Sequence, residues 1–162
     1  MPLVMARIDD RLVHGQVIVG CCEPLAADRL LVCDEAVAGD ALRQGLFAAA
    51  VPPGIDVEFV APVDAPARVR AAADDTAHDT ILLTRDAVTM AVLVERGAEL
   101  AQVVVGGAHD RPETTEAPAG WFLTGAERAA LRAMLRQGIA VCFQPVPGSP
   151  SIDAGEALGP AS

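Results

Sequence analysis

The chain has 162 residues, of which 52% are hydrophobic and 21% charged, and its formal net charge is −10. A chain of this length and composition is expected to fold as one domain spanning residues 1–162, because it is too apolar to remain disordered. The negative charge disfavours nucleic acid or an anionic membrane surface as a general partner, since binding to either needs clustered basic groups.

The first residues and the cysteines indicate where the protein acts. No apolar run reaches the roughly 18 residues of a membrane span, and the start of the chain lacks the pattern of a signal peptide. A cytoplasmic location is therefore expected. The four cysteines, at 21, 22, 33 and 142, show no CxxC spacing. Reduced thiols are expected in place of a zinc site or a disulfide framework.

Short β-rich segments alternate with longer segments of helical character along the chain. The predicted strands are 3–8, 29–34, 56–62, 80–84, 102–107, 121–124 and 140–146, and the predicted helices are 14–26, 38–51, 64–75, 87–97 and 125–138. This order predicts an α/β fold with three α/β/α layers: an open, mostly parallel seven-stranded sheet with helices on both faces. Residues 147–162 show little apolar periodicity, so this tail is expected either to dock as one short helix or to fray.

In open sheets of this kind, ligands bind at the carboxyl ends of the strands near a topological switch point. The loops of interest are therefore Asp9–Gly15, Cys33–Ala38, Thr84–Ala87 and Gly106–Gly120. The first of these contains the densest polar cluster of the chain, in the sequence RIDDRLVHGQV at 7–17.

The cluster has the composition of an anion site. Arg7 and Arg11 carry guanidinium groups that can bind phosphate oxygens in pairs, and the backbone N–H groups at a helix start also favour negative charge. His14 is the side chain of this loop that can act as a nucleophile. The loop is therefore suited to phosphoryl transfer. Composition and spacing alone favour the simpler interpretation, a solvated histidine beside a structural ion-pair cluster.

Three further residues of the cluster have plausible supporting roles. Asp9 and Asp10 can orient an arginine or the imidazole ring, and Gly15 would let a bulky anion approach the backbone.

The segment ARIDDRLVHGQV closely resembles the active-site segment of the IIB component of the mannose/fructose/sorbose family of the bacterial sugar phosphotransferase system. The likeness continues through LLVCDEAVAGDALRQGLFAAAVPPG, VLVERGAELAQVVVGG and FLTGAERAALRAMLRQGIAV, and becomes weaker after about Pro147.

The resemblance implies that His14 accepts a phosphoryl group from a phosphohistidine on a IIA protein, with Nδ1 as the suggested atom. The group then passes to a sugar that enters through the IIC and IID membrane components. Arg7 and Arg11 match family arginines that would neutralise the transferring group, and Asp9 matches an aspartate that would hold an arginine or the ring. Gln16 matches by position, either with a role in the site or as a packing residue. No cofactor, metal or nucleic acid is implied.

The chain departs from the family pattern at two places. Cys21 stands where family members usually carry a tryptophan, and the loop GGAHDRPETTE lacks the usual methionine and basic group. His109 and Arg111 in this loop either lie at the surface or line the phosphohistidine pocket, with Arg111 replacing the basic group. Asp34 matches a family aspartate that would cap a helix or reach Arg7 or Arg11.

These departures leave three functions open: a relay to sugar, a regulatory relay to a protein partner, and a binding module for a phosphorylated ligand. A metal site built from His14, His109 and Asp34 has suitable ligand types, but their spacing does not favour it.

Overall fold

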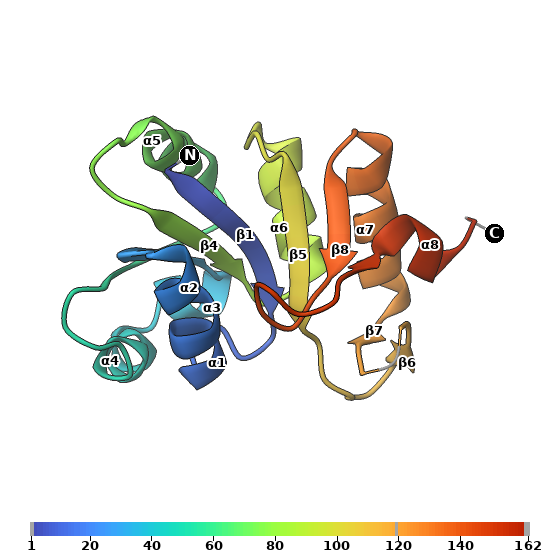
Figure 1. The fold of residues 1–162 in the computed structure, drawn as a ribbon, viewed down its shortest axis with the longest axis horizontal. Coiled ribbons are helices and arrows are strands. Elements are labelled where there is room, and N and C mark those ends of the chain that lie inside the picture. Colours follow the sequence, from blue (N-terminus) through green and yellow to red (C-terminus); the bar gives the residue numbers. More distant parts are fainter. Residues whose placement is uncertain (1, 119, 161–162) are drawn as a thin grey trace.

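A computed structural model describes residues 2–118 and 120–160. Its main sheet has seven strands in the order β3-β2-β4-β1-β5-β8-β9, of which the first six are parallel and β9 is antiparallel to β8 (Figure 1). The strands are β1 (Leu3–Asp9), β2 (Arg29–Cys33), β3 (Asp56–Val60), β4 (Thr80–Thr84), β5 (Gln102–Gly107), β8 (Ala140–Phe143) and β9 (Ile152–Asp153). The predicted α/β architecture is confirmed.

The prediction was wrong about which segment supplies one strand of the sheet. Residues 121–124 were expected to join it, but β7 (Phe122–Leu123) pairs only with β6 (Thr115–Glu116), in a separate antiparallel ribbon. The segment is reached from β5 without a helix, and a parallel neighbour needs a long crossover connection. The helix that follows β7 completes this crossover and leads to β8, which lies beside β5.

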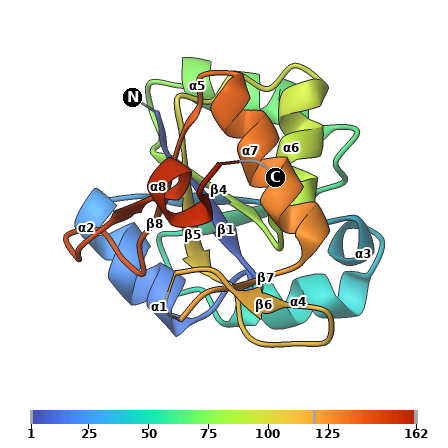
Figure 2. The same ribbon diagram turned by 90° about the vertical axis from the view of Figure 1, so that its right-hand side faces the viewer.

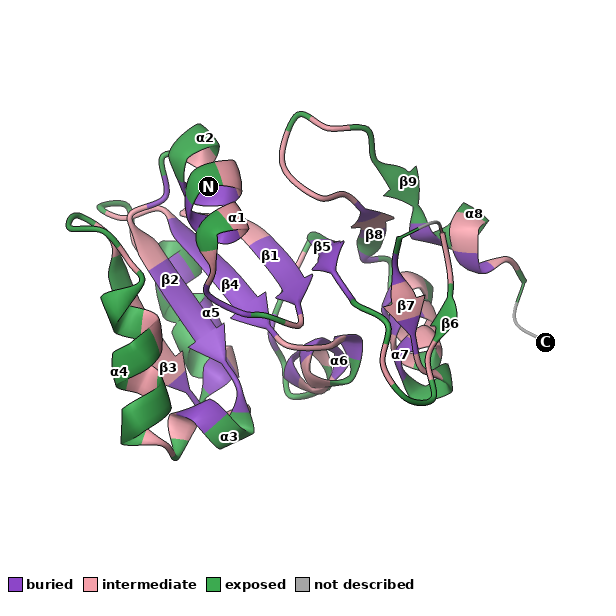
Figure 3. Ribbon diagram, turned by 90° about the horizontal axis from the view of Figure 1, so that it is seen from below, coloured by how far each residue is buried: buried purple, intermediate pink, exposed green. Residues whose placement is uncertain are grey.

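Helices cover both faces of the sheet, as the three-layer prediction requires (Figure 3). They are α1 (Gly15–Val17), the π-helical segment η1 (Ile18–Cys22), α2 (Glu23–Leu25), α3 (Glu35–Ala38), α4 (Ala41–Ala49), α5 (Ala65–Asp74), α6 (Ala87–Glu95), α7 (Gly125–Arg136) and α8 (Ala154–Leu158). Among the described residues, no helix has the length and apolar character needed to span a membrane.

Side chains at the helix starts explain several boundaries. Asp40 and Asp86 accept hydrogen bonds from backbone N–H groups of α4 and α6. Thr124 and Glu127 form a capping box at the start of α7, in which each side chain bonds the other residue's N–H. These contacts satisfy N–H groups that have no partner within the helix.

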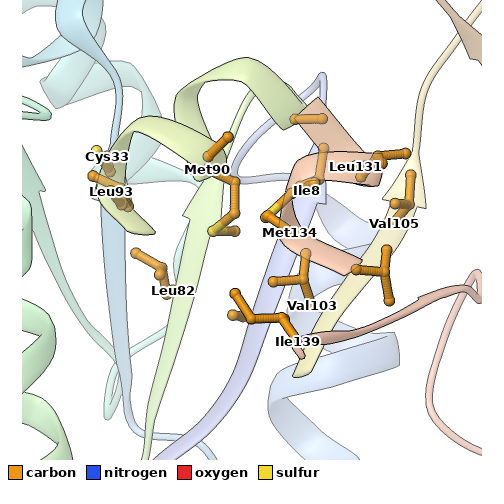
Figure 4. Packing of buried hydrophobic residues seen from close by; sticks show 14 of the residues in the cluster. Ile8, Cys33, Leu82, Met90, Leu93, Val103, Val105, Leu131, Met134 and Ile139 are labelled. Atoms are coloured by element: carbon orange, nitrogen blue, oxygen red, sulfur yellow. The ribbon is translucent and has the colours of Figure 1, made fainter. Parts of the chain in front are cut away.

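The core divides into two clusters because successive strand residues point to opposite faces. Leu31 and Leu82 belong to a cluster that packs against α5, α6 and α7, while Leu30 and Leu83 belong to a second cluster beneath the α1–α2 segment. Figure 4 shows the first cluster, in which Met90 of α6 and Met134 of α7 point toward the strands.

The first helical segment widens into a π-helix between α1 and α2. Pro24 has no N–H, and a proline ring crowds the carbonyl four residues earlier, which here is that of Gly20 within η1. Gly20 also faces Val146, against which an added Cβ would collide. This helix therefore packs closely against the connection between β8 and β9.

The tail does more than dock as one short helix. Ile152 pairs with Phe143 in the sheet, and α8 packs beside α7 and β8 (Figure 2). Ala154 and Leu158 are buried there. The tail was not predicted as a strand because a two-residue strand is too short to show periodicity. The last two residues of the predicted tail, 161 and 162, lie outside the described residues.

Candidate functional site

The polar residues predicted from the sequence gather at the carboxyl end of β1. This strand lies between β4 and β5, so the loops that follow all three strands meet at one edge of the sheet (Figure 1). Asp9 pairs in register with Gly107 of β5, and the N–H of Asp10 donates to the carbonyl of Gly107 at 3.1 Å. The loop after β1 is thus held at its start by the end of β5.

Asp9 lies at the centre of the site and is fully buried. Its Oδ2 accepts a hydrogen bond from Arg7 Nη2 at 2.9 Å and lies 2.9 Å from His14 Nε2. Its Oδ1 accepts from the backbone N–H of Arg11 at 3.1 Å. The carboxylate therefore joins the buried arginine, the loop backbone and the imidazole.

These contacts determine the charge of Asp9. Burial by itself raises the pKa of this carboxyl, but the hydrogen bond with His14, the bond from the Arg11 N–H and the charge of Arg7 outweigh it and lower the pKa to about 2. Asp9 is consequently ionised at neutral pH and can only accept hydrogen bonds. The nitrogen that faces it, Nε2 of His14, must then carry the proton.

Arg7 is fully buried, and its guanidinium is engaged by protein groups. Besides Asp9, it donates to the carbonyl of Pro145 at 2.8 Å. Its guanidinium also occupies the space above Gly106, where an added Cβ would overlap it. Arg7 thus has no exposed surface in this structure, and its guanidinium binds Asp9.

Gly107 has the same relation to Asp9 that Gly106 has to Arg7, since a Cβ on Gly107 would lie 2.9 Å from Asp9 Oδ1. Because Gly106 and Gly107 have no side chains, neither residue collides with the charged side chain beside it. The Gly-Gly pair at the end of β5 thus makes room for the two charged side chains of β1, a role that the sequence did not reveal.

Arg11, unlike Arg7, is exposed, with half of its side chain accessible. Its Nη2 lies 3.4 Å from Gln16 Oε1, and Arg7 Nη2 approaches the same oxygen at 3.5 Å. The side-chain oxygen of Gln16 therefore bridges the two guanidiniums. Arg11 retains N–H groups that can face an anion in solvent.

His14 immediately precedes α1, and its ring is 16% exposed. Of the two ring nitrogens of His14, only Nε2 has a hydrogen-bond partner among the described residues, and that partner is Asp9. Gly15 beside it is exposed, and apart from its chain neighbours and its own helix backbone no atom lies within 4 Å of the place where a Cβ would stand. The predicted open approach at Gly15 agrees with this geometry.

The turn that leads to His14 contains a strained residue. Leu12 has φ of 57° and is completely buried. A non-glycine residue in this left-handed region costs roughly 1–2 kcal/mol. Its N–H donates to the carbonyl of Asp9 at 3.0 Å, which closes the turn and returns the chain toward the carboxylate.

Asp10 and the loop after β5 form a second pair. His109 binds the Asp10 carboxylate twice, through its backbone N–H and through Nδ1, both at 2.7 Å. The Arg111 guanidinium contacts Glu127 and donates to the carbonyl of His109. Of the two alternatives left open for Arg111, a surface position or a place in the pocket, neither is decided, but its guanidinium is engaged by the buried Glu127.

Asp34 does not reach Arg7 or Arg11. One of its oxygens accepts a hydrogen bond from the N–H of Val37 at 3.1 Å and so caps α3, which is the first of the two roles predicted for it. The other accepts from Nε of Arg85 at 3.1 Å. Arg85 was missed by sequence reasoning, although its position directly after a strand, in a loop already singled out, was an available signal.

Two other expectations concern metals and thiols. Among residues 2–118 and 120–160, no group of three or more His, Cys, Asp or Glu side chains is placed to hold a metal ion. Cys21, which stands in place of the family tryptophan, is buried, and its thiol is not disulfide-bonded. Burial raises the pKa of this thiol, which keeps it protonated.

Comparison with known proteins identifies the family of the chain. The family model "PTS system sorbose subfamily IIB component" matches residues 3–161. The sorbose-specific EIIB component of Klebsiella pneumoniae is 30% identical over 155 residues, covering 94% of this chain and 93% of the relative. The N-acetylgalactosamine-specific enzyme IIB component 1 of Escherichia coli is 32% identical over 148 residues, covering 90% and 92%.

Among solved structures, the IIBSor domain of the sorbose permease from Klebsiella pneumoniae superposes with a TM-score of 0.85 at 27% identity, over 98% of this chain and 96% of that one. The fold and nearly the whole sequence therefore lead to the same assignment. The chain belongs to the sorbose subfamily of the IIB components of the phosphotransferase system.

Proposed function

We propose that His14 is the phosphoryl acceptor of this IIB component, receiving the group from a phosphohistidine on a IIA protein and passing it to a sugar. The contact between His14 and Asp9 carries the proposal. Because the ionised carboxylate only accepts hydrogen bonds, Nε2 holds the proton and Nδ1 of the neutral ring keeps its lone pair. The reacting atom is therefore Nδ1, in agreement with the family resemblance.

In the transfer step, the Nδ1 lone pair attacks phosphorus as the P–N bond to the donor histidine breaks. The acceptor ring becomes positively charged, and Asp9 at 2.9 Å stabilises that charge. Arg11, whose side chain is half exposed, is the guanidinium proposed to neutralise the phosphoryl oxygens. Arg7 acts indirectly, because it binds the Asp9 carboxylate that orients the His14 ring.

Sugar is the proposed final acceptor, because the similar IIB proteins are named for sorbose and for N-acetylgalactosamine. The sugar hydroxyl would attack phosphorus, the Nδ1–P bond would break, and the hydroxyl proton would be released. IIC and IID membrane components are the partners expected for this step, with the IIB chain in the cytoplasm.

A regulatory relay to a protein partner is the second candidate. It is favoured by the atypical loop after β5, in which the one arginine that could replace the usual basic group, Arg111, is engaged by Glu127. Neighbouring genes for IIC and IID components would support transport, and their absence would support the regulatory role.

The chemistry is tested by incubating the chain with phosphoenolpyruvate, the general phosphocarrier proteins and a cognate IIA protein. We expect an acid-labile, base-stable label that is lost in His14→Ala. Arg11→Ala should slow labelling by on the order of a hundredfold. Arg43→Ala is the matched control, because Arg43 is similarly exposed and also paired with a nearby aspartate, Asp40.

A wild-type chain that stays unlabelled while the IIA donor is demonstrably active would contradict the relay. A nearly normal rate in Arg11→Ala would remove this arginine from the mechanism and leave the acceptor role of His14 intact.

A further inference from the structure

Arg85, which directly follows β4, joins the loops after three different strands. Its Nε donates to Asp34 Oδ1 at 3.1 Å, and its Nη1 donates to the backbone carbonyl of Asp10 at 3.3 Å. Asp34 follows β2 and Asp10 follows β1, so one guanidinium connects the strand ends β2, β4 and β1, which are neighbours in the sheet.

The carboxylate that anchors Arg85 is itself held firmly. Asp34 is 7% exposed, its second oxygen caps α3, and its N–H donates to the carbonyl of Val60 at 3.1 Å. These two hydrogen bonds, to α3 and to the end of β3, restrain Asp34. Asp34 in turn restrains the Arg85 guanidinium that contacts the loop after β1.

The atom that Arg85 holds is placed where the acceptor loop needs support. The carbonyl of Asp10 lies two residues before Leu12, whose left-handed conformation is unfavourable for a residue with a side chain. Arg11 and His14 lie on either side of that turn. Strained turns persist where surrounding contacts determine them, and Arg85 supplies such a contact from outside the loop.

We propose that Arg85 is a positioning residue for phosphoryl transfer: by tying the Asp10 carbonyl to Asp34, it fixes the Leu12 turn and thereby the places of Arg11 and His14. This proposal rests on the proposed acceptor role of His14. Arginine suits the task because its planar fork donates in two directions at once, whereas a lysine ammonium on a flexible stem does not reproduce that geometry.

The test compares Arg85→Ala and Arg85→Lys with the wild-type chain in single-turnover transfer from the phosphorylated IIA protein, across donor concentrations. Small displacements of reacting groups can cost up to a hundredfold in rate. We expect the rate at saturating donor to fall about tenfold in Arg85→Ala, with half-saturation unchanged within about twofold. Arg85→Lys should recover less than half of the loss.

Arg29→Ala is the matched control. Arg29 donates to Asp75 at 3.1 Å with a side chain 30% exposed, against 39% for Arg85, but it lies at the opposite end of the sheet, at the start of β2. Its transfer rate should remain within about twofold of wild type. Amide hydrogen exchange at Arg11 and Leu12 should be faster in Arg85→Ala than in Arg29→Ala.

Unchanged saturating rates and unchanged exchange in Arg85→Ala would overturn the proposal, as would a change confined to half-saturation, which would make Arg85 a donor-binding residue. If Arg85→Ala does not fold, Asp34→Asn is measured in its place, because its remaining oxygen can still cap α3 while the charge partner of Arg85 is lost. An unlabelled wild-type chain would refute the relay alone, since the exchange comparison would still decide whether Arg85 holds the loop.

Discussion

Two consecutive aspartates each bind a histidine at this edge of the sheet, and the surroundings of the two pairs differ. Asp9 is fully buried, contacts Arg7, and holds a His14 ring that is 16% exposed. Asp10 is 19% exposed, and its partner His109 is 57% exposed. The short carboxylate–imidazole distance is common to both, so distance does not distinguish their roles.

The two pairs differ in burial and in the buried arginine, Arg7, that, of the two aspartates, contacts only Asp9. A buried carboxylate paired with a buried arginine must keep its contacts, because losing one leaves an uncompensated charge. Solvent competes for the hydrogen bonds of the exposed pair, so this pair contributes less to stability than a buried one. We therefore expect Asp9 to hold the His14 ring in one orientation, and we expect the Asp10–His109 contact only to attach the loop after β5 to the loop after β1.

The largest expected effect separates the two aspartates directly. Asp9→Asn should slow phosphoryl transfer to His14 by on the order of a hundredfold or more, because an amide can donate to Nε2 and so favour the wrong tautomer. Asp10→Asn keeps the backbone carbonyl that Arg85 binds and should remain within about threefold of wild type. Single-turnover labelling of both variants measures the contrast.

Circular dichroism of each variant provides the folding control for that experiment. Equal losses of rate in Asp9→Asn and Asp10→Asn, with both variants folded, would show that the two pairs are equivalent despite their different burial.

The next effect concerns stability in acid. The folded-state pKa of Asp9 is lowered from 3.8 to about 2, so its contribution is present above pH 3.8 and is lost as the pH falls through about 2. This contribution is roughly 2 kcal/mol of unfolding free energy. Urea unfolding measured between pH 5 and pH 2 should show this loss in wild type and in Asp10→Asn.

In Asp9→Asn the same contribution is absent, so its unfolding free energy should fall less between pH 5 and pH 2, although the variant is less stable at neutral pH because Arg7 loses its partner. If all three proteins lose stability in parallel, the low pKa of Asp9 is not coupled to folding.

The sequence indicated those contacts of the site that lie close together along the chain and missed those that come from distant residues. The residues around His14 lie within one short segment, so their types and spacing indicated an anion site. Pro145 and Arg85 reach the same site from 138 and 75 positions away along the chain, at Arg7 and Asp10 respectively. Such contacts depend on strand order, and periodicity shows where strands are but not which strands become neighbours.

The smallest expected effect tests the exposed pair by itself. His109→Ala removes the ring contact with Asp10 but keeps the backbone N–H that donates to the same carboxylate at 2.7 Å. Because the ring is more than half exposed, its loss should change the rate of labelling at His14 by less than about threefold. A drop approaching that of Asp9→Asn would place the His109 ring within the transfer machinery and end the distinction between a buried orienting pair and a surface fastening.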